Sequence, residues 1–243
     1  MTLETWTPLI TGSPAIGLGS YGDTVDPQCA GESYSIAKAD FRRDWYRFEV
    51  REGEAADYDN PASVNRSEFE CDTRMAFNTD YWISYAFCMR PGDTILTGWS
   101  LFGQLHHSPD SGEDGFSPPF AIEYNTSTGN LEIVRRTSTQ NPLVTAPTRV
   151  VAATIPFQRG RVYNILQQHN INPTGTGKHN VWFDGSQVLA YSGHTGYVDA
   201  VGPYWKMGIY REASTEALIA EYGNFEMTTD SLDARRNSPL VIG

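Results

Sequence analysis

Residues 180–189, NVWFDGSQVL, indicate the fold of this chain most directly. Two short runs that contain β-branched or aromatic residues flank Asp184-Gly185, and Asp-Gly favours the type I′ turn that joins two antiparallel strands. The stretch therefore predicts a β-hairpin. Similar runs recur along the chain between turn signals such as Pro91-Gly92 and Gly202-Pro203, a pattern typical of short strands.

Most of the sequence from residue 45 onward shows this strand pattern, and segments with helical periodicity are hard to find. Many short strands with Gly-rich connections favour two antiparallel sheets packed face to face. We therefore expect an all-β fold, an antiparallel β-sandwich of the jelly-roll type, with a closed barrel as the alternative. The expected strands are 45–51, 66–71, 82–89, 97–106, 119–124, 130–135, 148–155, 161–168, 180–184, 187–191, 203–211 and 218–227.

The length of 243 residues fits one large domain, because all-β domains often reach this size as a single unit. We expect a single domain over residues 1–243. Residues 1–40 are rich in Gly, Ser and Pro and are expected to form loops and an edge strand. Residues 228–243 follow the last expected strand as a C-terminal tail.

The composition excludes several classes of protein. Hydrophobic residues make up 40% of the chain, so burial of apolar surface can offset the entropy lost on folding, and a disordered chain is excluded. The net charge of -11, from 18 Lys and Arg against 29 Asp and Glu, argues against nucleic acid and anionic membranes as partners. No apolar stretch of roughly 18 residues is present, so no membrane span is expected.

The cysteines and two outlying histidines give no sign of a metal or redox site. Cys29, Cys71 and Cys88 are too few for a disulfide scaffold, and no Cys-x-x-Cys pair occurs. Cys71 and Cys88 lie near the ends of two expected strands, where a disulfide between them and two buried free thiols are both compatible with the sequence. His179 and His194 lie near Gly-rich turns and are expected at the surface.

Three expected strands carry polar side chains on one face, because alternate residues of a strand point to opposite faces. The polar sets are Arg66, Glu68 and Glu70, then Gln104 and His106, then Tyr204, Lys206 and Tyr210, with Gly208 leaving room for a ligand. The opposite faces carry Phe69, Leu105, Trp205, Met207 and Ile209. One such strand is ordinary, but three together indicate an exposed, concave binding face.

The three strands resemble the signature strands of the β-jelly-roll polysaccharide lyases. Arg66-Ser67-Glu68-Phe69, Gln104-Leu105-His106 and the run YWKMGIY at residues 204–210 are similar to the alginate-lyase motifs Arg-x-Glu-Leu, Gln-(Ile/Val)-His and Tyr-Phe-Lys-x-Gly-x-Tyr. Residues 46–53 and 206–211 are closer to the heparin-lyase and glucuronan-lyase branch. The resemblance spans residues 45 to 227. Glu70 replaces a second Arg that is common in alginate lyases, which argues against alginate as the first substrate.

The resemblance implies a concanavalin A-like jelly roll whose concave cleft holds a uronic-acid glycan. Such lyases act by β-elimination: the C5 proton leaves, the bond to O4 breaks, and an unsaturated sugar remains. Carried over by position, the expected catalytic residues are His106 and Tyr210 as base and acid, and Gln104 and Arg66 as neutralisers of the substrate carboxylate. Whether His106 or Tyr210 is the base is left open. The expected substrate-binding residues are Lys206, Glu68, Tyr204, Arg211 and His107.

Two of these binding residues have more specific expected roles. Glu68 would orient Arg66, and Lys206 would lower the pKa of Tyr210 or bind a neighbouring carboxylate. No cofactor is expected to be required. His107 with Asp110, Glu113 and Asp114 matches no strong metal motif, so no catalytic metal is expected, and a structural calcium ion in this acidic loop is the alternative.

An unsulfated uronan is the expected substrate. Highly sulfated heparin requires a basic cleft, which the acidic excess of this chain does not favour. We expect glucuronan first, alginate second, and a glucuronate-containing bacterial exopolysaccharide third. The resemblance further implies a monomeric enzyme that is secreted or extracellular, phage-borne in the third case, with its signal peptide absent from this sequence.

Two other functions remain compatible with the sequence. A glycoside hydrolase of the same fold would draw its carboxylate pair from Glu68, Glu70 and Glu123. A noncatalytic, lectin-like carbohydrate-binding module would use Trp residues as stacking platforms, although in a sandwich these are more often in the core: Trp45, Trp182 and Trp205. Release of an unsaturated product distinguishes a lyase from both.

Overall fold

Fourteen β-strands form two seven-stranded sheets in the part of the chain that the structure, a computed structural model, describes: residues 25–39 and 45–238. The first sheet has the order β1 (Val25–Cys29), β4 (Val64–Cys71), β13 (Val201–Glu212), β6 (Ser100–Ser108), β7 (Phe120–Asn125), β8 (Asn130–Arg135) and β9 (Val150–Ile155). The second has the order β12 (Ser186–Gly193), β11 (Gly177–Phe183), β10 (Tyr163–Asn170), β5 (Asp80–Met89), β14 (Leu218–Thr228), β3 (Tyr46–Val50) and β2 (Ile36–Lys38).

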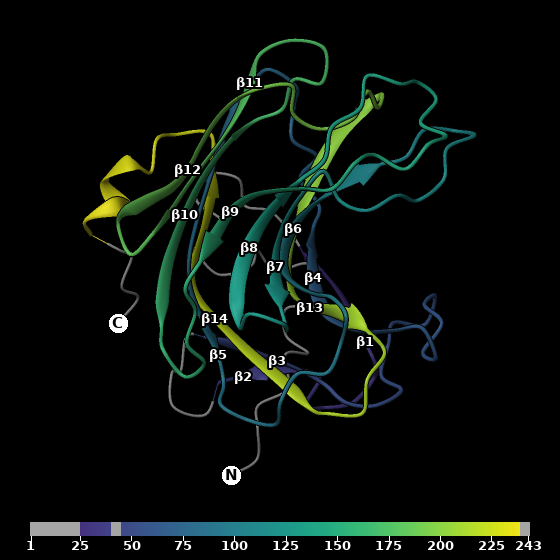
Figure 1. The fold of residues 1–243 in the computed structure, drawn as a ribbon, viewed down its shortest axis with the longest axis vertical. Helices are drawn as coiled ribbons and strands as arrows, with labels where there is room; N and C mark the ends of the chain where they lie inside the picture. The colour runs from purple at the N-terminus through teal and green to yellow at the C-terminus, as the bar shows by residue number, and fades with distance from the viewer. Residues whose placement is uncertain (1–24, 40–44, 239–243) are drawn as a thin grey trace.

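The named strands pair antiparallel throughout, and Figure 1 shows the two sheets as separate layers, with β10, β12 and β14 in one and β4, β6 and β7 in the other. Each sheet ends in two edge strands, β1 and β9 in the first and β12 and β2 in the second. The all-β, jelly-roll sandwich prediction is confirmed, and the closed-barrel alternative is wrong.

The core lies between the two sheets and takes the apolar residues that strand alternation directs inward. Phe69, Leu105 and Trp205 are all fully buried in one cluster with residues of the second sheet. Phe48 of β3 meets Phe69 of β4 edge to face, with ring centroids 4.8 Å apart. Burial of each large side chain of this kind stabilises the fold by about 1.5–3 kcal/mol, so this core fixes the opposite, polar face of β4, β6 and β13.

The predicted hairpin is confirmed. β11 and β12 pair antiparallel through the turn Asp184-Gly185, whose φ angles of 47° and 79° are the positive values that a type I′ turn requires. An edge strand was expected within residues 1–40, and the structure has two there; the pattern did not locate either one, because β1 contains Pro27 and β2 has only three residues. Both are edge strands, where such residues are tolerated. The expectations for residues 1–24 and 239–243 lie outside the described residues.

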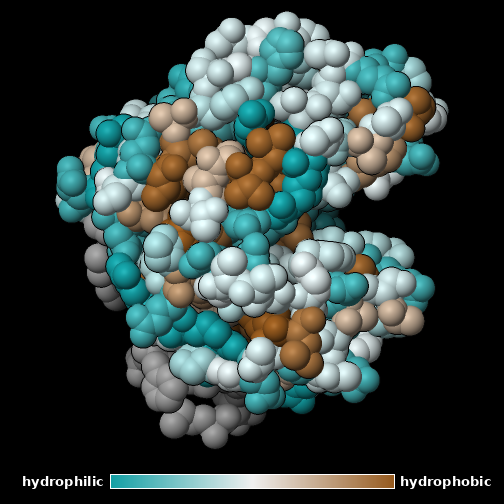
Figure 2. Space-filling view, viewed as in Figure 1, coloured by the Kyte–Doolittle hydropathy of each residue, from teal (hydrophilic) through white to brown (hydrophobic). Residues whose placement is uncertain are grey.

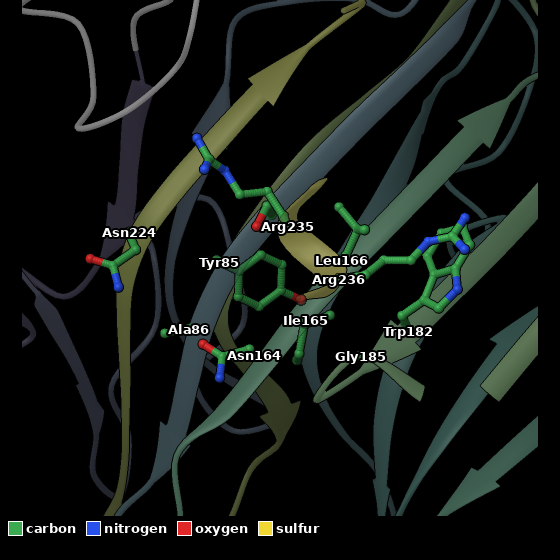
Figure 3. A pocket seen from close by; sticks show the side chains of 11 residues that line it. Tyr85, Ala86, Asn164, Ile165, Leu166, Trp182, Gly185, Asn224, Arg235 and Arg236 are labelled. Carbon is green, nitrogen blue, oxygen red and sulfur yellow. The ribbon is translucent and has the colours of Figure 1, made fainter. Parts of the chain in front are cut away.

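The C-terminal segment after β14 covers part of the outer face of the second sheet. The 3-10 turn η3 (Asp233–Arg236) follows Leu232, which packs on a small cluster of Trp82, Leu166 and Trp182. Arg236 extends over the Trp182 ring, 4.2 Å from its centroid, as Figure 3 shows. The cavity beside Trp182 and Arg236 has a volume of only about 10 Å³, room for one water molecule. It is therefore too small to be a ligand site.

The remaining structural expectations concern the cysteines and the membrane. Cys29, Cys71 and Cys88 are free thiols, so the proposed Cys71–Cys88 disulfide is wrong and the alternative of two buried thiols is confirmed. The described part of the chain contains no helix with the length and apolar composition needed to cross a bilayer.

Candidate active site

A pocket of about 310 Å³ lies on the outer face of the first sheet, the face opposite the core. Figure 2 shows the molecule notched on its right-hand side, where Figure 1 places β4, β6 and β13. The pocket is lined by Arg66, Trp99, Leu101, Gln104, His106, Gly115, Phe116, Ser117, Pro118, Glu123, Arg136, Arg149 and Tyr210. Four of these, from three separate strands, are the expected catalytic residues.

The order of the sheet brings the three motif strands together. β13 lies between β4 and β6, and its register pairs Tyr210 with Arg66 of β4. On its other side Lys206 pairs with Gln104 and Tyr204 with His106. Cross-strand partners lie about 5 Å apart, so the polar sets predicted from alternation become one cluster.

Glu68 is the centre of this cluster. Its carboxylate accepts hydrogen bonds from Arg66 Nη1 and Gln104 Nε2, each at 2.7 Å, and lies 3.3 Å from Lys206 Nζ. Burial acts to raise the pKa of Glu68, but Lys206, Arg66 and the Gln104 bond together outweigh it and hold the pKa below its usual value. Glu68 is therefore a buried anion that positions three donors, as expected for Arg66.

Arg66 is held from a second side by Asp59, which the sequence did not single out. Its Nε and Nη2 donate to the Asp59 carboxylate at 2.6 and 3.1 Å, in a bidentate pair. The guanidinium lies 3.8 Å from the centroid of the Tyr210 ring. Asp59 lies in the loop between β3 and β4, where strand periodicity gives no signal.

His106 has one ring nitrogen in hydrogen bonds and one with no hydrogen-bond partner among the described residues. Nδ1 lies 2.8 Å from the carbonyl oxygen of His107 and 3.1 Å from the Tyr204 hydroxyl. Because a carbonyl only accepts, the hydrogen-bond network assigns the proton to Nδ1 and leaves the Nε2 lone pair free. Burial, aided by Lys206, lowers the pKa of His106 to about 4, so the imidazole is neutral at physiological pH.

Burial shifts the pKa of Tyr210 upward, opposite to its effect on His106. Burial raises its pKa above the usual 10, against the opposing effect of Arg66, so the phenol keeps its proton at neutral pH. Trp99 packs edge to face on the Tyr210 ring with centroids 5.0 Å apart. The cation that acts to lower the Tyr210 pKa is thus Arg66; Lys206, the cation expected to do so, instead approaches Glu68.

Comparisons with known proteins identify the family of this chain. Residues 15–228 match the protein family described as "Polysaccharide lyase". This chain is a polysaccharide lyase. The match covers most of the sequence, including all three motif strands. The comparison with curated protein sequences gave no match.

Several solved lyase structures share the fold of this lyase. The endo-β-1,4-glucuronan lyase from the fungus Trichoderma reesei is 16% identical with a TM-score of 0.62, covering 88% of this chain and 90% of that one. The alginate lyase AlgAT5 from polysaccharide lyase family 7 is 15% identical with a TM-score of 0.57, covering 81% and 83%. The alginate lyase AlyC3 is 10% identical with a TM-score of 0.58, covering 94% and 98%. At these identities the likeness establishes the jelly-roll fold.

The binding face of the lyase is less exposed than expected. Glu68, Gln104 and Lys206 are 3% exposed or less, and Arg66 is also buried. Tyr204 is partly exposed, and Arg74 lies over its ring at 3.7 Å, while burial raises its pKa to about 12. Arg66, Gln104, His106 and Tyr210 line the pocket, whereas Glu68 and Lys206 are buried beside them and do not line it.

None of the five expected substrate-binding residues lines the pocket, and two of them, Arg211 and His107, are fully buried in other contacts. Arg211 is fully buried and donates to Asn65 and Glu216, so it stabilises the start of β4 against the loop after β13. His107 is also fully buried, because it follows His106 on the strand and points to the other side. The structure does not support either residue as a substrate ligand.

Gly208 serves the backbone and not the ligand. Its φ of 134° is one that other residues rarely adopt, and a Cβ there would lie 2.3 Å from the carbonyl oxygen of Ser67. Across the same stretch β13 has one more residue than β6, since Lys206 pairs with Gln104 and Tyr210 with Leu101. Gly208 therefore permits the β-bulge that precedes Tyr210.

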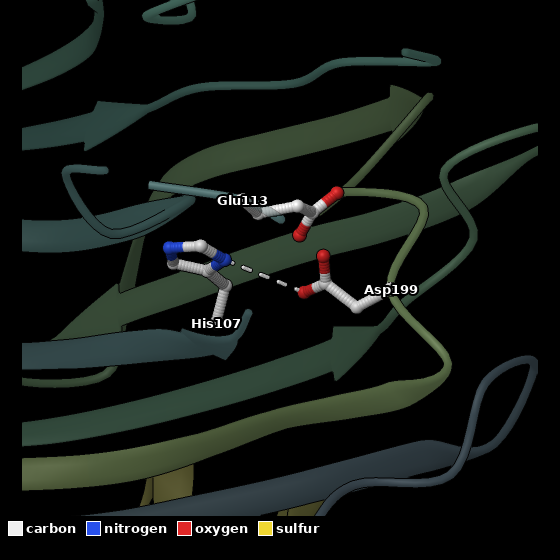
Figure 4. A group of neighbouring side chains, drawn as sticks. All are labelled: His107, Glu113 and Asp199. Atoms are coloured by element: carbon white, nitrogen blue, oxygen red, sulfur yellow. Dashed lines mark ion pairs between the residues drawn. The ribbon is translucent and has the colours of Figure 1, made fainter. Parts of the chain in front are cut away.

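His107, Glu113 and Asp199 form the one group of potential metal ligands found among the described residues, with ligand atoms within 4.8 Å of one another. Figure 4 shows the imidazole and both carboxylates directed toward one another. His107 Nδ1 lies 3.6 Å from Asp199, while Nε2 accepts a hydrogen bond from the Phe116 amide. A metal ion on Nδ1 would leave the ring proton on Nε2, facing that amide hydrogen.

This group therefore does not fit a metal ion, and calcium fits it least, since calcium takes six to eight oxygen ligands. Glu113 is already bonded to backbone, because its carboxylate accepts from the Asp110 and Leu143 amides. The group instead fastens the loop between β6 and β7, whose Gly115 and Phe116 line the pocket. His107 therefore helps to hold the loop that lines the pocket, and does not line the pocket itself.

The two outlying histidines have different environments. His194 is exposed, as expected. The surface expectation for His179 is wrong: it is fully buried, with its Nδ1 2.8 Å from Nδ1 of buried His169. His169 on β10 and His179 on β11 both face the core, where each contacts Phe120. Strand alternation alone does not distinguish a buried polar pair of this kind from an exposed one.

Proposed function

We propose that this lyase cleaves an unsulfated uronic-acid polysaccharide by β-elimination, glucuronan first and alginate second. The observation that carries the proposal is the pairing, in one pocket, of a neutral imidazole with a free Nε2 and a protonated phenol, His106 and Tyr210. The first is suited to accept a proton and the second to donate one.

The substrate carboxylate is the group that must be neutralised first. The C5 proton is weakly acidic while the adjacent carboxylate keeps its charge, so donors must bind the carboxylate and the enolate that replaces it. Arg66 uses three of its five N–H groups on Asp59 and Glu68, which leaves two for the substrate. Gln104 adjoins it at the Glu68 carboxylate and supplies a further donor from the pocket lining, while buried Lys206 adds positive charge beside Glu68.

The elimination then needs one proton acceptor and one donor. His106 Nε2 takes the C5 proton, and the electron pair of that bond moves to the carboxyl group. As the C4–O4 bond breaks, Tyr210 gives its proton to O4, and the C4–C5 double bond forms. The phenolate left on Tyr210 lies against the Arg66 guanidinium, which stabilises it.

The charge balance of the site supports an unsulfated uronan, and the order of glucuronan before alginate follows the sequence resemblance. The cations Arg66 and Lys206 are balanced by Asp59 and Glu68, which disfavours a highly sulfated chain.

The ultraviolet absorbance of the unsaturated product tests the proposal. Purified protein is incubated separately with glucuronan, polymannuronate, polyguluronate and heparin. We expect absorbance to rise fastest on glucuronan, next on polymannuronate, and not on heparin. Release of reducing ends without absorbance would replace elimination with hydrolysis and contradict the proposal.

Substitution at the two proton-transfer residues tests their roles. Tyr210→Phe and His106→Asn should each lower kcat by about 10²–10⁴-fold with the fold retained, since proton transfer by a positioned group contributes this much. Matched controls are Tyr191→Phe on β12 and His194→Asn in an exposed loop, which should keep full activity. Turnover at the wild-type rate in Tyr210→Phe would contradict the mechanism.

The alternative functions have less support. A lectin of the expected kind needs exposed Trp platforms, but Trp205 is fully buried and Trp182 lies beneath Arg236. A hydrolase needs a carboxylate pair across the scissile bond, but Glu68 is enclosed by its three donors and Glu123 is paired with arginines.

A further inference from the structure

The pocket extends well beyond the proposed proton-transfer pair. Cross-strand partners form one row across five strands, and this row runs from Arg66 through Tyr210 and Leu101 to Glu123 and Glu132. Neighbouring strands lie about 4.8 Å apart, so Glu123, two strands from Tyr210, lies roughly 10 Å from it along the row. A glycan that crosses the strands would place another sugar over this second end.

Arg149, just before β9, reaches back over this second end. Its Nε and Nη2 donate to Glu123 at 3.1 and 2.8 Å, and Nη2 also donates to Glu132 at 2.6 Å. These bonds fix the plane of the guanidinium. The side chain remains 43% exposed and lines the pocket.

The hydrogen bonds among the described residues leave Nη1 of Arg149 without an acceptor. Nε and Nη2 are the nitrogens directed at the two glutamates, so Nη1 offers two N–H groups. Arg136, by contrast, is buried, and it donates to Glu123 and to the carbonyl oxygen of Pro118. Of the two arginines, Arg149 is therefore the one that can bind a ligand.

The charges at this end are balanced, because two arginines face two glutamates. Arg136 already pairs with Glu123, and Asn125 already donates to Glu132, so neither carboxylate depends on Arg149 alone. The glutamates orient Arg149, while its unused edge remains a charged donor. Such an edge suits a single carboxylate better than a densely charged sulfate cluster.

We infer that Arg149 is a binding subsite for the carboxylate of a uronate unit beside the one whose C5 proton is removed. This inference rests on the proposed function, since it requires a uronan in the pocket. It assigns Arg149 to substrate binding and not to proton transfer. Its removal should weaken binding of chains long enough to reach it.

The test measures affinity without turnover. Tyr210→Phe and the double variant Tyr210→Phe/Arg149→Gln are titrated by calorimetry with oligoglucuronates of increasing length. In the single variant, affinity should rise when the added sugar reaches Arg149. In the double variant that increment, about tenfold or more for a charged hydrogen bond, should disappear while the shortest oligomers bind equally.

Matched variants separate binding from structural effects. Tyr210→Phe/Arg161→Gln removes an exposed arginine that pairs with Asp184 in the distant hairpin, and it should bind every length like the single variant. Arg149→Lys should restore part of the increment, since it keeps the charge without the planar fork. Equal weakening at all lengths in the Arg149→Gln variant, or no weakening, would overturn the subsite. Binding by the wild type without any unsaturated product would instead overturn the proposed function and leave the subsite standing.

Discussion

His106 and Tyr210 occupy one pocket, and burial moves their pKa values in opposite directions. Burial disfavours the charged form of each group, which is the protonated form of histidine and the deprotonated form of tyrosine. Burial in the pocket thus keeps the imidazole of His106 neutral and the phenol of Tyr210 protonated. Glu68 resists the same effect only because Arg66, Gln104 and Lys206 surround it.

The pH dependence of kcat/KM tests this assignment. The proposed mechanism requires neutral His106, whose pKa is about 4, so kcat/KM should fall as pH decreases through about 4 and not near the ordinary 6.5. It requires protonated Tyr210, whose pKa is raised above 10, so no alkaline loss is expected below pH 10.

Circular dichroism at each pH provides the control for this profile, because loss of the fold in acid would imitate loss of the base. An acid midpoint near 6.5 in protein that remains folded would show that His106 is not the buried base described here.

At the scale of the element, β13 carries most of the site. It supplies Tyr204, Lys206 and Tyr210, it lies between β4 and β6, and its bulge at Gly208 resets the pairing with β6 before Tyr210. The pairing with β4 stays regular over the same residues. The strand therefore keeps its contact with Arg66 and Glu68 while it shifts against Gln104.

Gly208→Ala should disturb this element. The new Cβ would lie 2.3 Å from Ser67 O and 2.6 Å from Glu68 Cα, so β4 and β13 must separate. We expect a loss of about 1–3 kcal/mol in the free energy of unfolding beyond that of Gly53→Ala, together with lower kcat. Gly53 is the matched control because its φ is also positive, at 73°, and nothing lies within 4 Å of its Cβ. Equal urea midpoints for the two variants would contradict the role of the bulge.

The sequence predicted those parts of the fold and site that depend on local alternation. A period of two residues was enough to place Arg66, Gln104 and Tyr210 on one face, and Asp-Gly was enough to place the hairpin. The adjacency of β4, β13 and β6 came from the resemblance, since alternation contains no information on strand order.

The sequence did not predict the roles of residues that lie in loops, or of polar residues whose side chains are buried. Asp59 and Arg149 lie outside strands and reach the site only through the fold. Arg211 has a polar side chain that suggests exposure, yet its partners Asn65 and Glu216 enclose it. A charged residue is buried when its hydrogen bonds are satisfied internally, and that depends on contacts distant in sequence.

At the scale of the whole molecule, the proposed substrate is a polyanion, while the chain itself has a net charge of -11. The charges in the pocket are balanced, so the excess negative charge lies elsewhere and repels the glycan at long range. Binding must therefore depend on short hydrogen bonds within the pocket.

Salt should consequently assist the reaction on polymer. Raising the ionic strength from about 10 mM to about 150 mM shortens the Debye length to about 8 Å, which screens the long-range repulsion more than the buried contacts. We expect kcat/KM on glucuronan to rise over this range, and to change less on a short oligomer. A steep fall with salt would indicate capture by long-range attraction and contradict this account.

The buried pair of His169 and His179 has a consequence for the conditions in which the enzyme can work. Burial lowers the pKa of His179 to about 3 and that of His169 well below 6.5, whereas an unfolded chain binds protons at both near 6.5. Below that pH, unfolding takes up protons, and stability declines by up to about 1.4 kcal/mol per pH unit for each histidine. Acid therefore weakens the fold through these two core histidines, and through His106 by the same effect, at pH values where folded His106 is still neutral.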